Sequence, residues 1–272
     1  MKKVILICTA CMMFVIACTT NAVTGRKQLS LISESALQQE AVSQYQAFLS
    51  QNKIVSASTS KDAEMVRRVG SRIAAAITQY YTQKGQSKDL EGYKWEFNLI
   101  DNKEINAWCM PGGKVVVYTG LLPVAQNEAA LAIVMGHEIT HAVAHHGQER
   151  ISQAMLAQGL QLGGNIFTSG NQTANNIFNN IYGPAASIGV LLPNSRNQEY
   201  EADHYGLIFA AMAGYNPREA IPFWQRMAAA GSAGGAQKPP EFLSTHPADE
   251  NRIAKLQGYM DEALKYYKPV HN

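Results

Sequence analysis

Two histidines four residues apart, His137 and His141, lie in the apolar stretch 131–150, and Glu138 follows the first of them. On an α-helix, residues four apart lie on one face, so these two imidazoles can bind a single metal ion. Glu138 would then lie beside the open coordination position of that metal, where a carboxylate can serve as a general base. Because a five-residue pattern also arises by chance, a metal site needs a third ligand elsewhere in the chain.

The acidic segment 199–203 supplies the candidate third ligand. Glu199 and Asp203 are four residues apart and would share one helix face, whereas Glu201 would point away from it. A catalytic zinc site has three protein ligands and one open position, so we expect Glu199 to complete a site for one Zn²⁺ per chain. Asp203 would accept a hydrogen bond from the free ring nitrogen of a histidine ligand, most simply His137. Without the histidine pair, a solvated helix face would explain the same acids.

The patterning around these residues predicts an α+β fold that is mostly α-helical, with a small mixed sheet. Apolar residues recur at helical spacing in the segments 33–49, 62–81, 127–150, 151–162, 197–212, 216–230 and 245–267. Alternating apolar residues predict strands at 93–99, 105–110 and 114–118. Pro111, Gly112 and Gly113 separate the last two strands, which indicates an edge strand flanking the histidine helix. Segment 163–197 is rich in Gly and Asn and is predicted to be irregular.

Residues 1–17 have a basic start and an apolar run too short to cross a bilayer comfortably, as in a secretory signal peptide. The residues that follow resemble a bacterial lipobox, in which Cys18 is acylated and becomes the new N-terminus. An ordinary signal peptide or a short membrane anchor is the alternative. We expect a tether over 18–32 and a single domain over 33–272. Thr19 after the cysteine favours an anchor in the outer membrane of the bacterial envelope, facing the periplasm.

At 272 residues and 46% hydrophobic, the chain is long enough to bury the core of one large domain. Its 23 basic and 21 acidic residues nearly balance and form no basic block, which argues against a nucleic-acid partner. If the signal peptide is removed and Cys18 carries lipid, Cys109 is the one remaining cysteine and no internal disulfide can form. Apolar neighbours favour a buried Cys109 over a nucleophile. The oligomeric state is not predicted.

Taken together, these motifs resemble the gluzincin zinc metallopeptidases of the HtpX and CAAX prenyl endopeptidase family, peptidase family M48. The matching motifs are Asn106-Ala107 with Pro111-Gly112-Gly113, Gly120-Leu121-Leu122, Gly136-His137-Glu138 with His141, Ser195-Arg196 with Glu199, Ala202 and Asp203, and His246-Pro247 with Arg252. Because no apolar span long enough to cross a membrane is present, the chain is similar to the BepA-like and LoiP-like periplasmic members rather than to the multi-pass members.

The resemblance implies a zincin-type domain that hydrolyses peptide bonds of unfolded or misassembled envelope proteins, as protein quality control. It assigns Glu138 to the general base that takes a proton from the attacking water and returns it to the leaving amine. The substrate would bind as an added strand along the strand formed by Ala107, Trp108, Cys109 and Met110. The implied partners are unfolded polypeptides, and the membrane is contacted through the lipid anchor.

His246 and Arg252 have more than one possible role. By the same resemblance, His246 could occupy the open zinc position and hold the enzyme shut, stabilise the oxyanion, or simply begin a helix. Arg252 could help to place the oxyanion, brace that segment, or form a surface ion pair. His145 and His146 are interpreted as surface residues or helix C-terminal cations, not ligands. The functional alternative is a latched, weakly active lipoprotein that acts mainly as a chaperone-like binding protein; the acid beside a ligand disfavours a purely structural metal.

Overall fold

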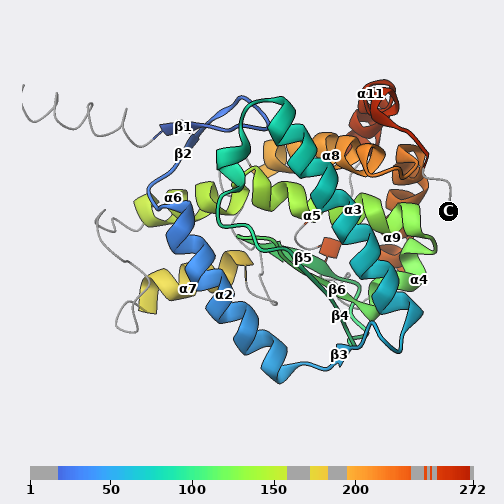
Figure 1. Cartoon of the computed structure of the whole chain (residues 1–272), viewed down its shortest axis with the longest axis horizontal. Helices are drawn as coiled ribbons and strands as arrows, with labels where there is room; N and C mark the ends of the chain where they lie inside the picture. Colours follow the sequence, from blue (N-terminus) through green and yellow to red (C-terminus); the bar gives the residue numbers. More distant parts are fainter. Residues whose placement is uncertain are drawn as a thin grey trace, which may run out of the picture.

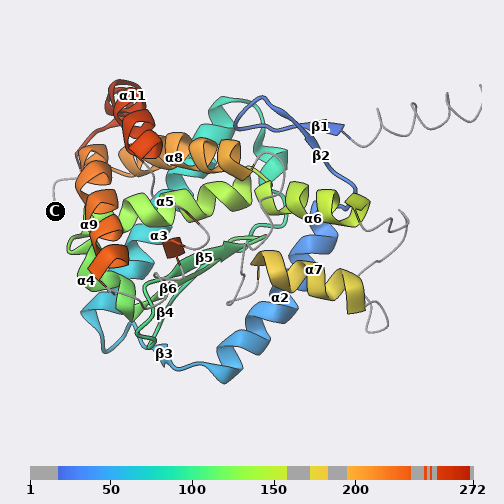
Figure 2. The same ribbon diagram turned by 180° about the vertical axis from the view of Figure 1, so that it is seen from behind.

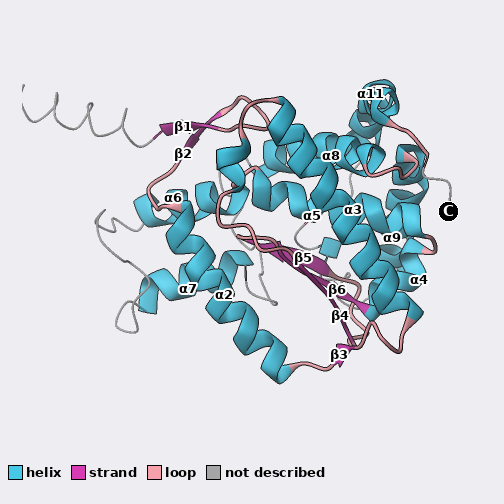
Figure 3. Cartoon of the chain, in the orientation of Figure 1, coloured by secondary structure: helices cyan, strands magenta, loops and turns pink. Residues whose placement is uncertain are grey.

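The computed structural model describes residues 18–157, 172–182, 195–233, 242–243, 246 and 250–269. Helices surround a small sheet (Figure 1 and Figure 3). The helices are α2 (Glu34–Gln51), α3 (Lys61–Gln83), α4 (Leu122–Ala125), α5 (Glu128–Val143), α6 (His146–Ala157), α7 (Gln172–Tyr182), α8 (Ser195–Met212), α9 (Ala220–Ala233) and α11 (Glu250–Tyr266). The strands are β1 (Cys18–Thr20), β2 (Lys27–Leu29), β3 (Ile54–Val55), β4 (Glu96–Ile100), β5 (Ala107–Met110) and β6 (Lys114–Tyr118). Among the helices in these ranges, none is both long and apolar enough to cross a membrane.

The main sheet has the strand order β3-β4-β6-β5, with β4 and β6 parallel and the other pairs antiparallel. Its two faces bury alternate residues, as the side-chain period of a strand requires. On β6, Val115 and Val117 join the core that contains α3 and α5, whereas Val116 and Tyr118 join a second core with α2. Accordingly, α5 and α8 lie above the sheet and α2 lies below it in both views (Figure 1 and Figure 2). The predicted mixed sheet is confirmed, and β5 is its edge strand beside α5.

The histidine-bearing helix α5 begins where the sequence predicts. Asn127 is its N-cap and accepts a hydrogen bond from the backbone N–H of Ala130 at 2.8 Å. Side chains on all sides of α5 are buried, because the sheet covers one side and α3 and α8 pack on others. A helix that is apolar all round is expected in the interior. The histidine pair is therefore carried by the most enclosed helix of the described structure.

α5 and α8 approach closely where two glycines meet. A Cβ atom on Gly136 would lie 2.8 Å from the carbonyl oxygen of Gly206, and one on Gly206 would lie 2.8 Å from the backbone nitrogen of His137. Only glycine permits this separation, since neither neighbouring backbone atom can rotate out of the way. The contact brings Glu199 and Asp203 of α8 within reach of His137. The geometry of the candidate site thus depends on this crossing.

We expect Gly206→Ala to lower the stability of the fold by about 1–3 kcal/mol, because the added methyl group must push the two helices apart. The same shift should weaken binding of a divalent metal. Thermal unfolding and metal titration measure both effects. Gly258→Ala on α11 is the matched control: a Cβ there meets nothing within 4 Å, and alanine in a helix is more stable than glycine by about 0.5–1 kcal/mol. Equal behaviour of the two variants would contradict the packing argument.

The histidine helix is predicted to run to residue 150, but it is broken earlier. α5 ends at Val143, His145 has a left-handed backbone with a φ of 54°, and α6 starts at His146. This conformation is unfavourable for a residue with a side chain. It is compensated by Glu34 of α2, whose carboxylate lies 3.0 Å from Nδ1 of His145. The break changes the direction in which His146 points, which matters for the site below.

Two segments predicted to be irregular contain regular structure. Within 18–32, β1 and β2 pair as an antiparallel hairpin. Within 163–197, α7 forms because Ile177 and Phe178 are buried in the core shared with α2, which outweighs the low helix propensity of the neighbouring asparagines. The predicted signal peptide over 1–17 and most of the rest of 163–197 lie outside the described residues. The division into signal peptide, tether and domain therefore stays a prediction.

Candidate metal centre

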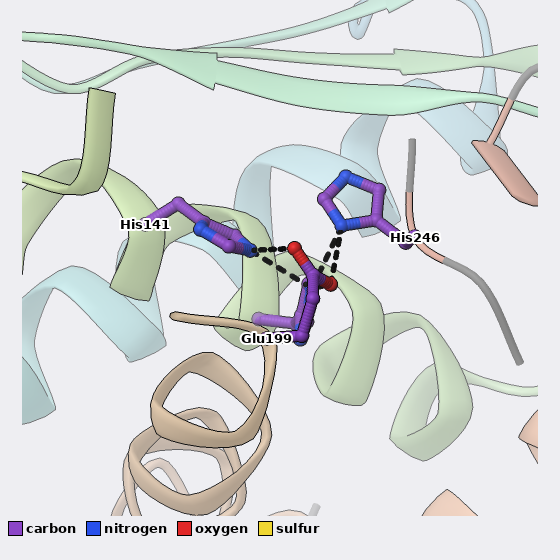
Figure 4. Close-up of side chains that lie close together, drawn as sticks. His141, Glu199 and His246 are labelled. Carbon is purple, nitrogen blue, oxygen red and sulfur yellow. Dashed lines mark hydrogen bonds and ion pairs between the residues drawn. The ribbon is translucent and has the colours of Figure 1, made fainter. Parts of the chain in front are cut away.

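His137 and His141 on α5, Glu199 on α8 and His246 place their ligand atoms within 4.8 Å of one another. Nε2 of His137 lies 3.1 Å from Nε2 of His141 and 3.4 Å from Oε2 of Glu199. Nε2 of His141 lies 3.5 Å from Oε1 of Glu199, and Nδ1 of His246 lies 2.8 Å from its Oε2. Figure 4 shows the imidazoles of His141 and His246 on either side of the Glu199 carboxylate. The three predicted ligands converge, and His246 joins them.

The protonation states of this cluster suit a divalent cation. Burial holds the pKa of His141 well below its ordinary value, so the imidazole keeps a free lone pair. Burial would raise the pKa of Glu199, but its interactions with the surrounding histidines outweigh burial and hold that pKa well below its usual range. Neutral imidazole nitrogens and an ionised carboxylate are the ligands that zinc and similar metals bind. The residues therefore fit a metal ion.

Glu138 presents to this cluster a carboxylate oxygen that accepts no hydrogen bond within the described part of the chain. Its Oε1 is buried, has no hydrogen-bond partner among the described residues, and lies 3.5 Å from Nε2 of His246 and 4.0 Å from Nε2 of His137. A buried oxygen without a partner marks a place where water or a ligand is expected. Burial also raises the pKa of Glu138 to about 7, although the charge of His246 opposes it. Glu138 therefore has the position and the proton affinity of a general base.

Asp203 and Arg252 hold His137 on the side away from the cluster. Nδ1 of His137 lies 2.9 Å from Oδ1 of Asp203, and Arg252 donates to both oxygens of that carboxylate at 2.6 and 2.8 Å. The guanidinium also lies 3.6 Å from the centre of the Trp224 ring. Burial would raise the pKa of Asp203, but Arg252 lowers it below its ordinary value. The ionised carboxylate fixes the tautomer of His137 that turns Nε2 toward the cluster.

Comparison with known proteins agrees with this geometry. The sequence profile of peptidase family M48 matches residues 60–260. The chain belongs to peptidase family M48. The mitochondrial metalloendopeptidase OMA1 of Arabidopsis thaliana is 35% identical to it over 71% of the chain and 40% of its own length. The metalloendopeptidase OMA1 of Bos taurus is 32% identical over 90% of the chain and 46% of its own length. The β-barrel assembly-enhancing protease of Escherichia coli is 31% identical over 59% of the chain and 33% of its own length.

The M48 chain spans about half the length of these relatives or less. The family that the sequence motifs resemble is confirmed, and the α+β fold with its histidine and glutamate cluster fits a zincin-like domain. The sequence motifs did not indicate mitochondrial relatives, because the lipobox-like N-terminus is typical of bacterial envelope proteins. The alignment with the Bos taurus relative covers 90% of the chain, which is more than the matched peptidase domain alone.

Two surface roles predicted for residues of this M48 chain are wrong. Arg252 is 2% exposed and braces Asp203, so it forms no surface ion pair. His146 is fully buried, with its Nδ1 2.9 Å from Nδ1 of His141 and its Nε2 2.9 Å from Oε2 of Glu201. Burial lowers the pKa of His146, so it is no helix C-terminal cation either. Helix α6 begins after the break at residue 145, which is why His146 turns toward the site.

Two other histidines, His145 and His204, lie in the described structure outside the cluster. Burial lowers the pKa of His145 and its hydrogen bond to Glu34 raises it, with a net rise, as for a cation at the C-terminus of α5. His204 lies off the metal face, and its Nε2 is 2.7 Å from a carboxylate oxygen of Glu262 on α11. His271 is outside the described residues. Neither His145 nor His204 belongs to the cluster of four side chains that could hold a metal ion.

β5 carries the predicted substrate strand and lies beside α5. It pairs with β6 on one side, and no other described strand pairs with its second side. This is the geometry that an added strand requires. Cys109 on this strand is 7% exposed, and burial raises the pKa of its thiol well above the ordinary value. The prediction of a buried Cys109 is confirmed.

The sequence did not reveal a polar network that joins the N-terminal hairpin to the site. Arg26, just before β2, makes ion pairs of 2.7 Å with both Glu149 and Glu201. These partners are 123 and 175 residues away along the chain, so no periodic pattern marks them. The available signal was a surplus of acids: Glu201 lies between Glu199 and Asp203 and has no place on their helix face.

Proposed function

We propose that the chain is a zinc-dependent metalloendopeptidase with one Zn²⁺ per chain. The observation that carries the proposal is the convergence of His137, His141 and Glu199 beside a buried oxygen of Glu138 that accepts no hydrogen bond from any described residue. Membership of family M48, with relatives named metalloendopeptidase and protease, supports it. Imidazole and carboxylate ligands together favour zinc over magnesium or calcium, which prefer oxygen ligands alone.

The residues around the cluster divide the chemistry of peptide hydrolysis among them. When bound, zinc polarises a substrate carbonyl and lowers the pKa of water toward neutrality. Glu138 accepts the proton of the attacking water and donates it to the amine that leaves. Asp203, paired with Arg252, keeps Nε2 of His137 directed at the cluster. His137, Glu138 and Glu199 are buried, and a low local dielectric constant strengthens these electrostatic effects.

The substrate class follows from the edge of β5. An extended peptide that adds to this edge is held by backbone hydrogen bonds, which read little sequence. Substrates are then selected by their ability to present an unfolded stretch, which fits misassembled envelope proteins. The name of the Escherichia coli relative supports a role in the assembly of such proteins. Cys18 is exposed at the start of the hairpin, as an acylation site in the outer membrane would require.

Removal of the metal provides the direct test. We expect casein cleavage by the full chain to fall to background with a zinc chelator and to return when Zn²⁺, but not Mg²⁺, is added. The measurement is the initial rate of release of labelled peptides. A serine-protease inhibitor serves as the control and should leave the rate unchanged. Cleavage that survives exhaustive chelation, with zinc shown to be absent, would overturn the proposed function.

The position of His246 favours a second candidate, a latched protein that binds unfolded chains and cleaves them slowly. His246 is buried between Glu199 and Glu138, with its Nδ1 2.8 Å from the first carboxylate and its Nε2 3.5 Å from the second. It thus occupies the space between the proposed ligand Glu199 and the proposed base Glu138. The role as a simple helix start has less support, because the imidazole is directed into the cluster (Figure 4). A substrate would have to displace it.

We expect His246→Ala to raise kcat/KM for casein by about tenfold, if the arrangement in which His246 has moved away is populated at ~10%. Steady-state kinetics at saturating Zn²⁺ measure this change. His204→Ala, on the outer face of α8, is the matched control and should leave the rate unchanged. A loss of activity in His246→Ala would instead favour a role in stabilising the oxyanion, and would exclude the latch.

A further inference from the structure

The two imidazoles on α5 that are proposed as metal ligands each lead to a carboxylate. For His137 the carboxylate is that of Asp203, 2.9 Å from Nδ1. For His141 the path passes through a second histidine: its Nδ1 lies 2.9 Å from Nδ1 of His146, whose Nε2 lies 2.9 Å from Oε2 of Glu201. Both paths leave from the ring nitrogen that faces away from the cluster. Each ligand imidazole is therefore supported from behind by ionised oxygen, directly in one case and through a relay in the other.

The hydrogen bonds of the longer path have a single consistent direction. Nε2 of His141 faces the cluster and must offer its lone pair to a metal, so its proton is on Nδ1. Nδ1 of His146 must then accept that proton's hydrogen bond, which leaves the proton of His146 on Nε2, where it is donated to Glu201. The other neutral tautomer of His146 would place two protons between the two Nδ1 atoms and two lone pairs between Nε2 and Glu201. The path thus fixes the metal-binding tautomer of His141.

An arginine ends each path. Arg252 holds Asp203, and Arg26 holds Glu201, with its Nε 2.7 Å from Oε1. Arg26 also donates to both oxygens of Glu149, at 2.8 and 2.7 Å. The hairpin that carries Arg26 is fixed in place, because the buried Asn21 side chain donates to the carbonyl of Ala144 at the break between α5 and α6. A pre-positioned guanidinium keeps Glu201 ionised and oriented toward His146.

A second chain of hydrogen bonds connects Arg26 to the cluster. Glu149 accepts a hydrogen bond of 2.7 Å from Nε2 of Gln198, and Oε1 of Gln198 accepts one of 2.6 Å from Nε of Arg150. Nη2 of Arg150 lies 3.4 Å from Oε1 of the proposed ligand Glu199. Gln198 and Arg150 are themselves buried. Arg26 is therefore connected to two of the proposed ligands, one on each of the two helices that form the site.

We propose that Arg26 and His146 are positioning residues for the metal site, through which the N-terminal hairpin sets the orientation and basicity of His141. The inference rests on the proposed function, since it takes His141 as a metal ligand. Removing a contact of this kind, one step behind a ligand, weakens metal binding by about 10–100-fold. The hairpin begins at Cys18, so the segment nearest the proposed lipid is part of the support of the metal site rather than a passive tether.

Metal affinity of the full chain in detergent tests this role. Zn²⁺ dissociation constants would be measured by competition with a colorimetric chelator, and the visible spectrum of the Co²⁺-substituted protein would report ligand geometry. The variants are His146→Leu and Arg26→Gln; the second is on the partly exposed hairpin and should fold even if the first does not. Arg68→Gln is the matched control. Arg68 lies on α3, away from the cluster, and like Arg26 it forms ion pairs with two glutamates, here Glu64 and Glu128.

We expect the Zn²⁺ dissociation constant to rise about 10–100-fold in His146→Leu and about tenfold in Arg26→Gln, with altered Co²⁺ spectra, while Arg68→Gln matches the wild type. Arg26→Lys keeps the charge and should recover part of the loss. The inference would be overturned if Arg26→Gln and His146→Leu bound Zn²⁺ as tightly as the wild type. A lower melting temperature of these variants in EDTA would not rescue it. Casein cleavage by the wild type tests the proposed peptidase function separately from the positioning role. If the wild type binds Zn²⁺ but does not cleave casein, the proposed function fails, and the Zn²⁺ affinities of the variants still decide the positioning role.

Discussion

Glu138→Gln should slow casein cleavage by a factor on the order of 10³ while Zn²⁺ stays bound. Glutamine has nearly the same shape as glutamate but cannot take a proton from water. Glu138 is not one of the four side chains whose ligand atoms converge, so its loss should leave the metal affinity unchanged. Its pKa, raised to about 7 by burial, is matched to accepting and releasing a proton near neutral pH, which is why the expected effect is large.

The measurement is kcat/KM together with the zinc content of the same preparation. Glu262→Gln is the control, because Glu262 is an exposed acid on α11 whose partner is His204. Full activity in zinc-loaded Glu138→Gln would remove Glu138 from the mechanism. Simultaneous loss of zinc and activity would mean that this carboxylate helps to hold the metal, and the role of general base would need another residue.

The core of the site could be predicted because its residues obey local rules. His137 and His141 are one helical turn apart, as are Glu199 and Asp203, so each pair shares a face in any helix. The one long-range assumption was that these two faces meet. The Gly136–Gly206 contact makes them meet, since it lets the two helices approach closely at the right height. β6 was predictable for a similar reason: residues that alternate between two cores leave a period of two in the sequence.

The supporting shell could not be predicted because it depends on contacts between distant segments. Nothing in the order Ala144, His145, His146 signals a left-handed residue, and glycine comes only after them. The bend is stabilised by Glu34, a residue on α2 that periodicity cannot place near His145. The hairpin is likewise held by ion pairs of Arg26 with acids on α6 and α8. Local propensity therefore reads residues 18–32 as irregular, whereas tertiary contacts order them.

Arg252→Leu should destabilise the fold by about 3–5 kcal/mol, the cost of leaving one member of a buried ion pair without its partner. Arg252 is 2% exposed, donates to both oxygens of Asp203 and lies over the Trp224 ring. Leucine would leave the buried negative charge of Asp203 without its arginine. For a chain of this size the melting temperature should fall by about 10 °C. Unfolding is best followed in EDTA, where loss of metal cannot contribute.

The source of that cost can be separated with a second substitution. If the uncompensated charge of Asp203 dominates, Arg252→Leu combined with Asp203→Asn should be more stable than Arg252→Leu alone, because no buried charge is left unpaired. If lost packing against Trp224 dominates, the second substitution should bring no recovery. Arg68→Leu is the control for removing an arginine that pairs with two acids in a more exposed position, and should cost about 1 kcal/mol or less. The double variant should still bind Zn²⁺ weakly, since an asparagine cannot replace the ionised carboxylate behind His137.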